Sequence, residues 1–213
     1  MTRLVAVGVI GLVLSACDRE IHIGATQTAP GSITILDTVG PRGETGWWPS
    51  LAIDHNDQPH LSFCDAYDAD LKYATRVGKQ WRVESVISEG KVGKYTALDV
   101  DSKGRVGIAF YDQDKKYLRY AYQIDDGAWK HERVAWGLEV GMGGELRFDT
   151  DDVPHMFYYL PSGKLIHAKK PAGSEWQKEV VAEVNGGFSV RISPVLRRDG
   201  FWISFVDWNF TDT

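Results

Sequence analysis

The chain has 213 residues, with 24 basic and 29 acidic side chains, and its formal net charge at pH 7 is −5. A mildly acidic surface argues against nucleic acid, or an anionic membrane surface, as the partner of this protein. Apolar residues make up 43% of the chain and aromatic residues 12%, which is ample for a packed core.

The N-terminus carries a targeting pattern. Residues 4–14 form an apolar run of 11 residues directly after Arg3. This run is too short to cross a bilayer, which takes about 20 residues, but it suits the central part of a signal peptide. Residues 14–17 read Leu-Ser-Ala-Cys and resemble the lipobox of bacterial lipoproteins. The resemblance implies removal of residues 1–16 and a diacylated Cys17 as the mature N-terminus.

A lipid on Cys17 would make the membrane a partner and place the protein in the bacterial cell envelope, either periplasmic or surface-exposed. Residues 17–30 are then the lipidated cysteine and a tether of mixed polarity. The alternative is an ordinary signal peptide, or an uncleaved anchor, with a chance cysteine at its end. The second cysteine, Cys64, has no partner for an intrachain disulfide once Cys17 is lipidated, and we expect it to be a small buried side chain.

The chain repeats itself with a period of 47 or 48 residues. Tyr73 and Tyr120 lie 47 residues apart, and Trp81, Trp129 and Trp176 follow one another at 48 and 47 residues. A fixed period of this size is the signature of a propeller, a solenoid or an array of small units.

Each repeat contains four short runs in which apolar and polar residues alternate, separated by turn-forming residues. This pattern predicts an all-β chain, a β-propeller of four-stranded antiparallel blades, over residues 31–213. Three blades are complete and a fourth is partial, and their expected bounds are 47–87, 94–135, 142–182 and 188–213.

The fourth repeat stops after its second strand, while residues 31–39 resemble a lone fourth strand. Such a strand commonly closes a propeller ring by completing its last blade. We therefore expect the chain to be part of a six- or seven-bladed propeller. The alternative is a compact ring of four incomplete blades.

The turn before the fourth strand has a family resemblance. Residues 125–129 read Asp-Asp-Gly-Ala-Trp, and weaker versions end at Trp81 and Trp176. They resemble a degenerate Asp-box, Ser-x-Asp-x-Gly-x-x-Trp, of sialidase-like propellers, and the whole repeat is similar to propeller-like lipoproteins of environmental bacteria. The resemblance implies a structural role, in which the Asp binds turn amides and the Trp packs between neighbouring strands.

Ligands of propellers usually bind on the face formed by the loops between second and third strands and between blades. Acidic and aromatic residues gather there, and such groups would suit a sugar or a peptide, because rings stack on apolar sugar faces while carboxylates take hydroxyls. The candidate binding residues are Trp47, Asp65, Tyr67, Asp112, Asp114, Tyr159, Asp207 and Trp208. The alternative is that these Asp residues merely satisfy the amides of their own turns.

Metal and cofactor signals are weak in this sequence. Asp65, Asp68 and Asp70 could offer hard oxygen ligands to Ca²⁺, but their loop lacks the Gly and the downstream Glu of an EF-hand. His60 and His155 occupy matching strand positions, which favours packing over zinc binding. We therefore expect no cofactor, with Ca²⁺ as the single candidate.

The sequence favours an envelope-anchored lipoprotein whose propeller binds a glycan or an envelope protein through one rim, without catalysis. One alternative is a sialidase-like glycoside hydrolase or lyase whose site is completed by further blades. The other is a structural scaffold in an envelope assembly. A nucleophile-elbow Gly-x-Ser-x-Gly and a zinc-binding His-Glu-x-x-His are both absent from the sequence.

Overall fold

The structure, a computed structural model, describes residues 12–13, 21–25, 35–39, 45–65, 67–125, 127–183 and 192–205. Within these segments all regular secondary structure is β-strand. Over the same segments, no helix has the length and apolar character needed to cross a bilayer.

Four antiparallel sheets account for the repeats. The first blade contains β4 (Thr45–Ile53), β5 (Pro59–Asp65), β6 (Asp70–Val77) and β7 (Gln80–Ile87). The second contains β8 (Lys94–Val100), β9 (Val106–Asp112), β10 (Tyr117–Gln123) and β11 (Trp129–Trp136). The third contains β12 (Glu145–Phe148), β13 (Pro154–Tyr159), β14 (Lys164–Lys169) and β15 (Gln177–Glu183). The fourth sheet contains β16 (Ile192–Arg197) and β17 (Gly200–Phe205).

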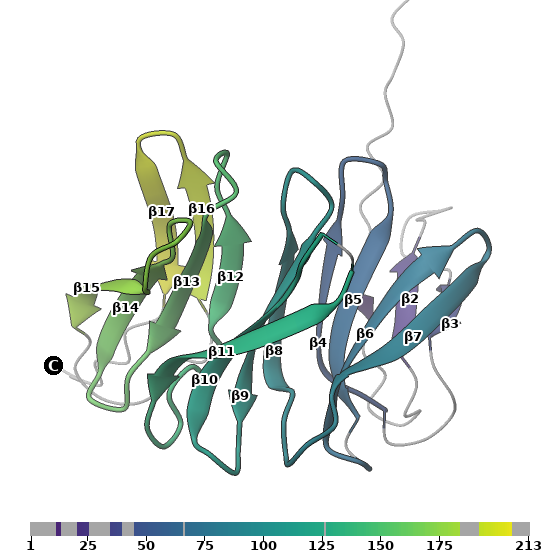
Figure 1. The fold of residues 1–213 in the computed structure, drawn as a ribbon, viewed down its shortest axis with the longest axis horizontal. Coiled ribbons are helices and arrows are strands. Elements are labelled where there is room, and N and C mark those ends of the chain that lie inside the picture. The colour runs from purple at the N-terminus through teal and green to yellow at the C-terminus, as the bar shows by residue number, and fades with distance from the viewer. Residues whose placement is uncertain are drawn as a thin grey trace, which may run out of the picture.

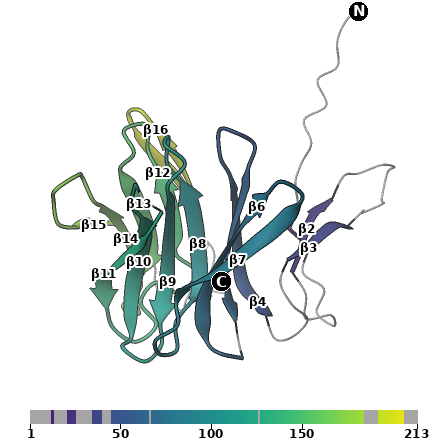
Figure 2. The same cartoon turned by 45° about the vertical axis from the view of Figure 1, so that its right-hand side comes forward.

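In each blade the strands pair in chain order, as in a meander. The blades lie side by side and form an open arc in the described part of the chain (Figure 1). The first strands line the inner side of this arc, where β8 lies between β4 and β12, and β12 lies against β16 (Figure 2). The prediction of an all-β propeller with three complete blades and part of a fourth is confirmed.

The core lies between the blades, since each sheet has two faces to bury. The second strand of the second blade, β9, is buried along its whole length, whereas in the outer strand β7 only Ile87 is buried. Apolar clusters join neighbouring blades: Phe110 packs with Leu71, and Met156 packs with Ala109. Each blade is therefore stabilised by the next one.

Polar side chains fasten the first strands to one another. Ser50 on β4 accepts a hydrogen bond from the backbone N–H of Leu98 on β8, at 2.9 Å. One boundary further along, Asp99 on β8 accepts from the N–H of Phe148 on β12, at 2.7 Å. These bonds satisfy backbone N–H groups that face the preceding blade instead of a strand of the same sheet.

The repeated Trp residues connect the outer parts of the blades. The indole N–H of Trp129 donates to Glu84 on β7 at 2.8 Å, and that of Trp176 donates to Glu132 on β11 at 2.7 Å. The Trp176 ring also meets the ring of Tyr120 edge to face, with centroids 5.5 Å apart. Trp129 and Trp176 thus each contact the preceding blade, whereas the resemblance implied packing between neighbouring strands.

The N-terminal segments differ from the expectation. β1 (Leu12–Val13), β2 (Ile21–Ala25) and β3 (Ile35–Val39) form a three-stranded antiparallel sheet. The expected lone strand over residues 31–39 is therefore present as β3 but is not alone, because Ile21 and Ile23 pair with Val39 and Asp37. The expected tether over residues 17–30 contains β2, in which apolar residues alternate with others over five positions. β2 pairs with β3 and so covers one edge of that strand.

The Trp-to-Glu hydrogen bond can be tested by Trp176→Phe, which keeps an aromatic ring and removes the donor. A hydrogen bond to a charged group stabilises a fold by about 1.5–3 kcal/mol. Because Lys170 still pairs with Glu132, we expect a loss of about 1–2 kcal/mol in the free energy of unfolding, measured by urea denaturation. The control is Trp202→Phe on β17, where the side chain is 72% exposed and the change should stay within about 0.5 kcal/mol. Equal losses in the two variants would contradict the assignment.

Candidate ligand-binding site

The turn between the first and second strands has the same construction in every complete blade. Asp101 Oδ1 accepts hydrogen bonds from the backbone N–H groups of Lys103 and Arg105, at 2.9 and 2.8 Å. Asp54 and Asp149 make the same pair of bonds in the first and third blades. These Asp residues hold tight turns, and their second oxygen is left to face the following strand.

The partner of that second oxygen changes from blade to blade. In the first and third blades it is a histidine: His60 Nε2 lies 3.5 Å from Asp54, and His155 Nε2 lies 3.1 Å from Asp149. Burial lowers the pKa of each histidine, against the opposing effect of its carboxylate. Each histidine thus contacts the carboxylate that holds the turn before its own strand.

The second blade uses an arginine instead. Arg105 donates from Nε to Asp101 Oδ2 at 2.7 Å, and its Nη2 lies 2.7 Å from the same oxygen. Its Nη1 reaches Asp125, in the turn between the third and fourth strands, at 3.2 Å. Asp125 is the acid of the Asp-box-like segment, and its side chain contacts this arginine. The guanidinium therefore bridges the two turns at one end of the second blade.

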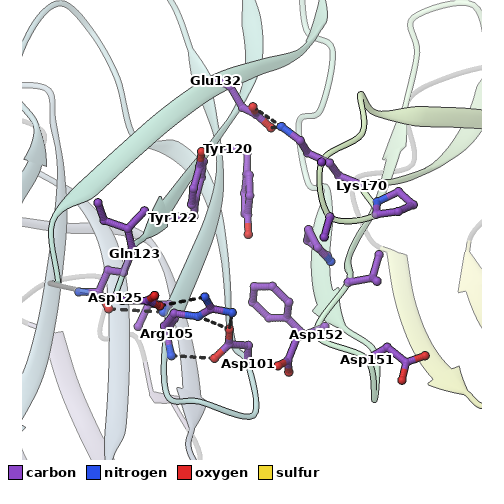
Figure 3. Close-up of a pocket in the computed structure, with 18 residues that line it drawn as sticks. Asp101, Arg105, Tyr120, Tyr122, Gln123, Asp125, Glu132, Asp151, Asp152 and Lys170 are labelled. Atoms are coloured by element: carbon purple, nitrogen blue, oxygen red, sulfur yellow. Dashed lines mark hydrogen bonds and ion pairs between the residues drawn. The ribbon is translucent and has the colours of Figure 1, made fainter.

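A cavity of about 350 Å³ opens beside this arginine, between the second and third blades. It is lined by turns at the same end of β8–β11 and β12–β15 (Figure 3). Its lining residues are Asp101, Arg105, Val106, Tyr120, Tyr122, Gln123, Ile124, Asp125, Glu132, Phe148, Asp151, Asp152, Val153, Pro154, Lys170, Pro171, Ala172 and Gly173.

Aromatic rings form the wall of the cavity. Tyr120 and Tyr122 both project from β10 and lie stacked, with ring centroids 5.2 Å apart and an angle of 17° between their planes. Phe148, at the end of β12, belongs to the lining from the third blade. Burial raises the pKa of Tyr120 far above its ordinary value, so its hydroxyl stays protonated and available as a donor.

Charged pairs lie at the two ends of this wall. Glu132 and Lys170 form an ion pair at one end, and Arg105 with Asp101 and Asp125 stands at the other, with Tyr120 and Tyr122 between them (Figure 3). Glu132 also accepts the indole N–H of Trp176. The carboxylate is therefore fixed from two sides before any ligand arrives.

The cavity is acidic overall. Five carboxylates (Asp101, Asp125, Glu132, Asp151 and Asp152) face two cations (Arg105 and Lys170), which leaves three net negative charges. Asp152 is engaged with the backbone N–H and the hydroxyl of Ser102 in the neighbouring blade, both at 2.8 Å. Hydrogen-bond acceptors, a cationic donor and a flat aromatic wall are thus combined in one cavity between two blades.

The rim residues that the sequence suggested lie at the opposite ends of the strands. Asp112 is buried, and its Oδ2 pairs with Arg119 at 2.9 Å while its Oδ1 accepts the N–H of Lys115. Asp114 accepts the N–H of Lys91 at 2.9 Å. Both carboxylates are therefore occupied by this chain's own groups.

The other rim candidates differ from one another in burial and in hydrogen-bond partners. Asp65 accepts the N–H of Tyr67, whose own side chain is 86% exposed. Trp47 is half exposed and Tyr159 is buried. Asp207 and Trp208 lie outside the described residues. The rim Asp contacts thus match the alternative, in which these carboxylates satisfy nearby amides.

Two of the calcium candidates, Asp65 and Asp70, are cross-strand partners in the β5–β6 hairpin. Asp70 is buried and accepts from Lys72 Nζ at 2.9 Å and from Ser85 Oγ at 3.3 Å. Asp65 is used by the amide of Tyr67, and Asp68 is exposed. Over the described segments, no three His, Cys, Asp or Glu side chains are arranged so that they could hold a metal ion.

Sequence reasoning missed the cavity because it looked for ligands at the other end of the blades. A signal was present in the departures from the repeat. Arg105 stands four residues after its turn Asp, where the first blade has Gln58 and the third has Val153. Tyr122 stands two residues after the repeated Tyr, where the first blade has Thr75. Arg105 and Tyr122 therefore depart from the residues that the first repeat has at the same positions, and both lie at this boundary.

Comparisons with known proteins show similarity in structure alone. No protein-family model matches the chain, and no curated protein matches its sequence. AofleA from Arthrobotrys oligospora is similar in fold, with a TM-score of 0.53 and 17% identity over 75% of this chain and 56% of that one. A lectin from Aleuria aurantia, solved with alpha-methyl-L-fucoside, gives a TM-score of 0.55 and 13% identity over 76% of this chain and 52% of that one.

A protein of unknown function from Dyadobacter fermentans gives a TM-score of 0.58 and 11% identity, over 93% of this chain and 71% of that one. By contrast, this chain spans only about half the length of AofleA and of the Aleuria lectin. At identities this low the likeness establishes the fold alone, which is that of a β-propeller.

Cys64 should be chemically inert in the folded protein. Its thiol donates to the carbonyl of Val92 at 3.4 Å, the side chain is 2% exposed, and burial raises its pKa to about 11. We expect a Cys17→Ser variant, which isolates this thiol, to react with iodoacetamide at pH 8 only after unfolding in urea. Labelling of the native variant as fast as the unfolded one would show that the site is open.

Proposed function

We propose that this protein binds glycans in the cavity between the second and third blades, and that it does so without turning them over. The observation that carries the proposal is the stacked Tyr120–Tyr122 wall between two preformed ion pairs. A pyranose ring has an apolar face for an aromatic wall and hydroxyls for carboxylates and a guanidinium, so its two chemistries match those of the cavity.

Preorganisation supports binding. Arg105 is fixed by Asp101 and Asp125, and Glu132 is fixed by Lys170 and Trp176. Groups that are already oriented lose little freedom when a ligand docks, so more of the interaction energy appears as affinity. The volume of about 350 Å³ suits a small ligand such as a single sugar. The likeness to a lectin that was solved with a methyl fucoside agrees with this class of ligand.

The proposal of binding without turnover rests on the same contacts. A glycosidase needs one carboxylic acid to donate a proton and a second carboxylate to act as nucleophile or base. Here Asp101 is held by Arg105 and by two backbone amides of its own turn, and Glu132 is held by Lys170 and the indole of Trp176. Carboxylates fixed in this way are placed to accept hydrogen bonds from sugar hydroxyls, and neither is free to move to a scissile bond.

The charge of the cavity predicts which sugars bind. With three net negative charges in the lining, an acidic sugar is repelled, whereas a neutral or amino sugar is not. In isothermal titration against methyl glycosides, we expect neutral sugars to bind more tightly than glucuronic acid, with the gap narrowing as salt is added. A preference for the acidic sugar would contradict the assignment, and release of free sugar during the titration would contradict binding without turnover.

The matched variants are Tyr122→Ala and Tyr117→Ala. Both residues lie on β10, but Tyr117 stands at the opposite end, where Arg133 lies over its ring at 5.2 Å. Removal of the stacking wall should weaken neutral-sugar binding about tenfold or more, which corresponds to about 1.4 kcal/mol. Tyr117→Ala should leave binding unchanged. Equal effects of the two changes, or no effect of Tyr122→Ala, would exclude this cavity as the site.

We further propose that the protein works at the bacterial cell envelope, tethered by a lipid on Cys17. The support is the apolar run over residues 4–14 followed by Leu-Ser-Ala-Cys. Removal of residues 1–16 would take β1 away and leave β2 and β3 as a hairpin. A glycan-binding domain on such a tether would face the polysaccharides or glycoproteins of that compartment.

The anchor is tested by the intact mass of native protein extracted from membranes with detergent. We expect the mature chain to begin at Cys17 and to carry acyl chains, and we expect Cys17→Ser to remain unacylated and to keep residues 1–16. Cys64→Ser is the control, because it should be processed like the native protein. An unacylated native protein would rule the anchor out.

A further inference from the structure

The first strands of the blades share an unusual backbone feature near their start. Trp48 and Tyr95 both have positive φ angles, of 50° and 54°, and the equivalent position before β12 is Gly143, with φ of 67°. Pairing with the second strand shifts register there, between Trp47 and Ser50 and between Lys94 and Ala97. A left-handed bulge of this kind suits glycine and is costly for a bulky aromatic residue.

The two costly residues are in contact. The rings of Trp48 and Tyr95 lie 5.0 Å apart across the boundary between β4 and β8, and Trp47 lies 5.3 Å from Trp48. Lys94 Nζ stands 5.3 Å from the centre of the Trp48 ring. Trp47 is 49% exposed, so this aromatic group is open to solvent on one side. Gly143 shows that the third blade adopts a positive φ at this position without a ring, so the backbone does not require these side chains.

Trp48, Tyr95 and Gly143 line a second cavity, of about 820 Å³, on the inner side of the arc. Its polar lining includes Glu145 at the start of β12 and Ser193 and Ser204 on β16 and β17. Glu145 pairs with Arg147 at 3.0 Å. The cavity thus combines aromatic rings in tilted contact with hydroxyl and carboxyl groups. It lies at the ends of the first strands opposite to the turns that line the interblade cavity.

We propose that this axial cavity is a second glycan site, in which Trp48 and Tyr95 hold the sugar rings of an oligosaccharide. The inference rests on the proposed function for the class of ligand, but on different residues. Backbone strain that persists in two blades and is relieved by glycine in the third is retained for the position of the side chains. A cavity of about 820 Å³ accommodates a longer ligand than the interblade cavity does.

The test replaces the strained aromatic residue by the residue that the third blade uses. In Trp48→Gly the left-handed backbone is favoured, so the midpoint of thermal unfolding should hold or rise by about 2–4 °C. The same variant should bind neutral oligosaccharides, such as xylohexaose and galactohexaose, about tenfold more weakly. Tyr95→Gly is the second variant and should behave in the same way.

The controls separate this site from the interblade cavity. Tyr122→Ala should lose binding of methyl glycosides and keep most oligosaccharide binding. Trp48→Gly should weaken oligosaccharide binding and keep most binding of methyl glycosides. A fall of the unfolding midpoint in both glycine variants would show that the rings serve packing, and would overturn the inference. Oligosaccharide binding that is unchanged in both glycine variants, with methyl glycosides still lost in Tyr122→Ala, would overturn it while leaving the proposed function intact. If no sugar of either kind binds the native protein, the proposed function fails and this inference fails with it.

Discussion

The hydrogen bond from the indole of Trp176 to Glu132 joins the architecture of this protein to its candidate site. It crosses from the third blade to the outer strand of the second, at 2.7 Å, and it repeats the bond from Trp129 to Glu84 one boundary earlier. An isolated antiparallel blade cannot bury both of its faces, so such contacts are what makes the repeats one body. The same bond holds Glu132 beside Lys170, and this ion pair forms one end of the interblade cavity.

The difference between the two boundaries shows how a repeat acquires a site. In the first blade the hydroxyl of Tyr73 lies 2.6 Å from His60 Nδ1, and Thr75 donates to the carbonyl of Pro59. These contacts use up the polar groups within the blade. In the second blade Arg105 and Tyr122 stand where the first blade has Gln58 and Thr75, and both residues line the interblade cavity. The two boundaries therefore differ in the side chains at these two positions of the repeat.

The period of 47 or 48 residues was enough to predict the blades, because strand alternation and turn residues are local properties of the chain. The contacts between particular side chains could not be predicted in that way. Asp112 looks like a free carboxylate at a strand end, yet Arg119 reaches it from the neighbouring strand at 2.9 Å. Such pairing depends on register across a hairpin and on burial, which the sequence pattern does not specify. The N-terminal sheet was missed because β2 has only five residues, within a stretch whose composition resembles a tether.

The position of the interblade cavity also depended on contacts between blades. Lys170 and Glu132 are 38 residues apart, and Asp152 and Ser102 are 50 residues apart. A periodic sequence predicts that neighbouring repeats touch, but not which side chains of each meet. The strained bulge is similar, because positive φ at Trp48 and Tyr95 follows from register shifts. Only the glycine at the third equivalent position gave a hint of it.

The energetics of the charged residues favour a role in binding over a role in stability. In the pair of Arg105 with Asp125, the side chains are 33% and 90% exposed. Ion pairs of this kind contribute about 0–1 kcal/mol, because water screens them and ordering two side chains costs entropy. Burial between the blades, the indole hydrogen bonds and the first-strand bonds of Ser50 and Asp99 therefore carry the fold. The charges of Arg105 and Asp125 add little to folding and lie beside an aromatic cavity, so they are free to be selected for what the cavity holds.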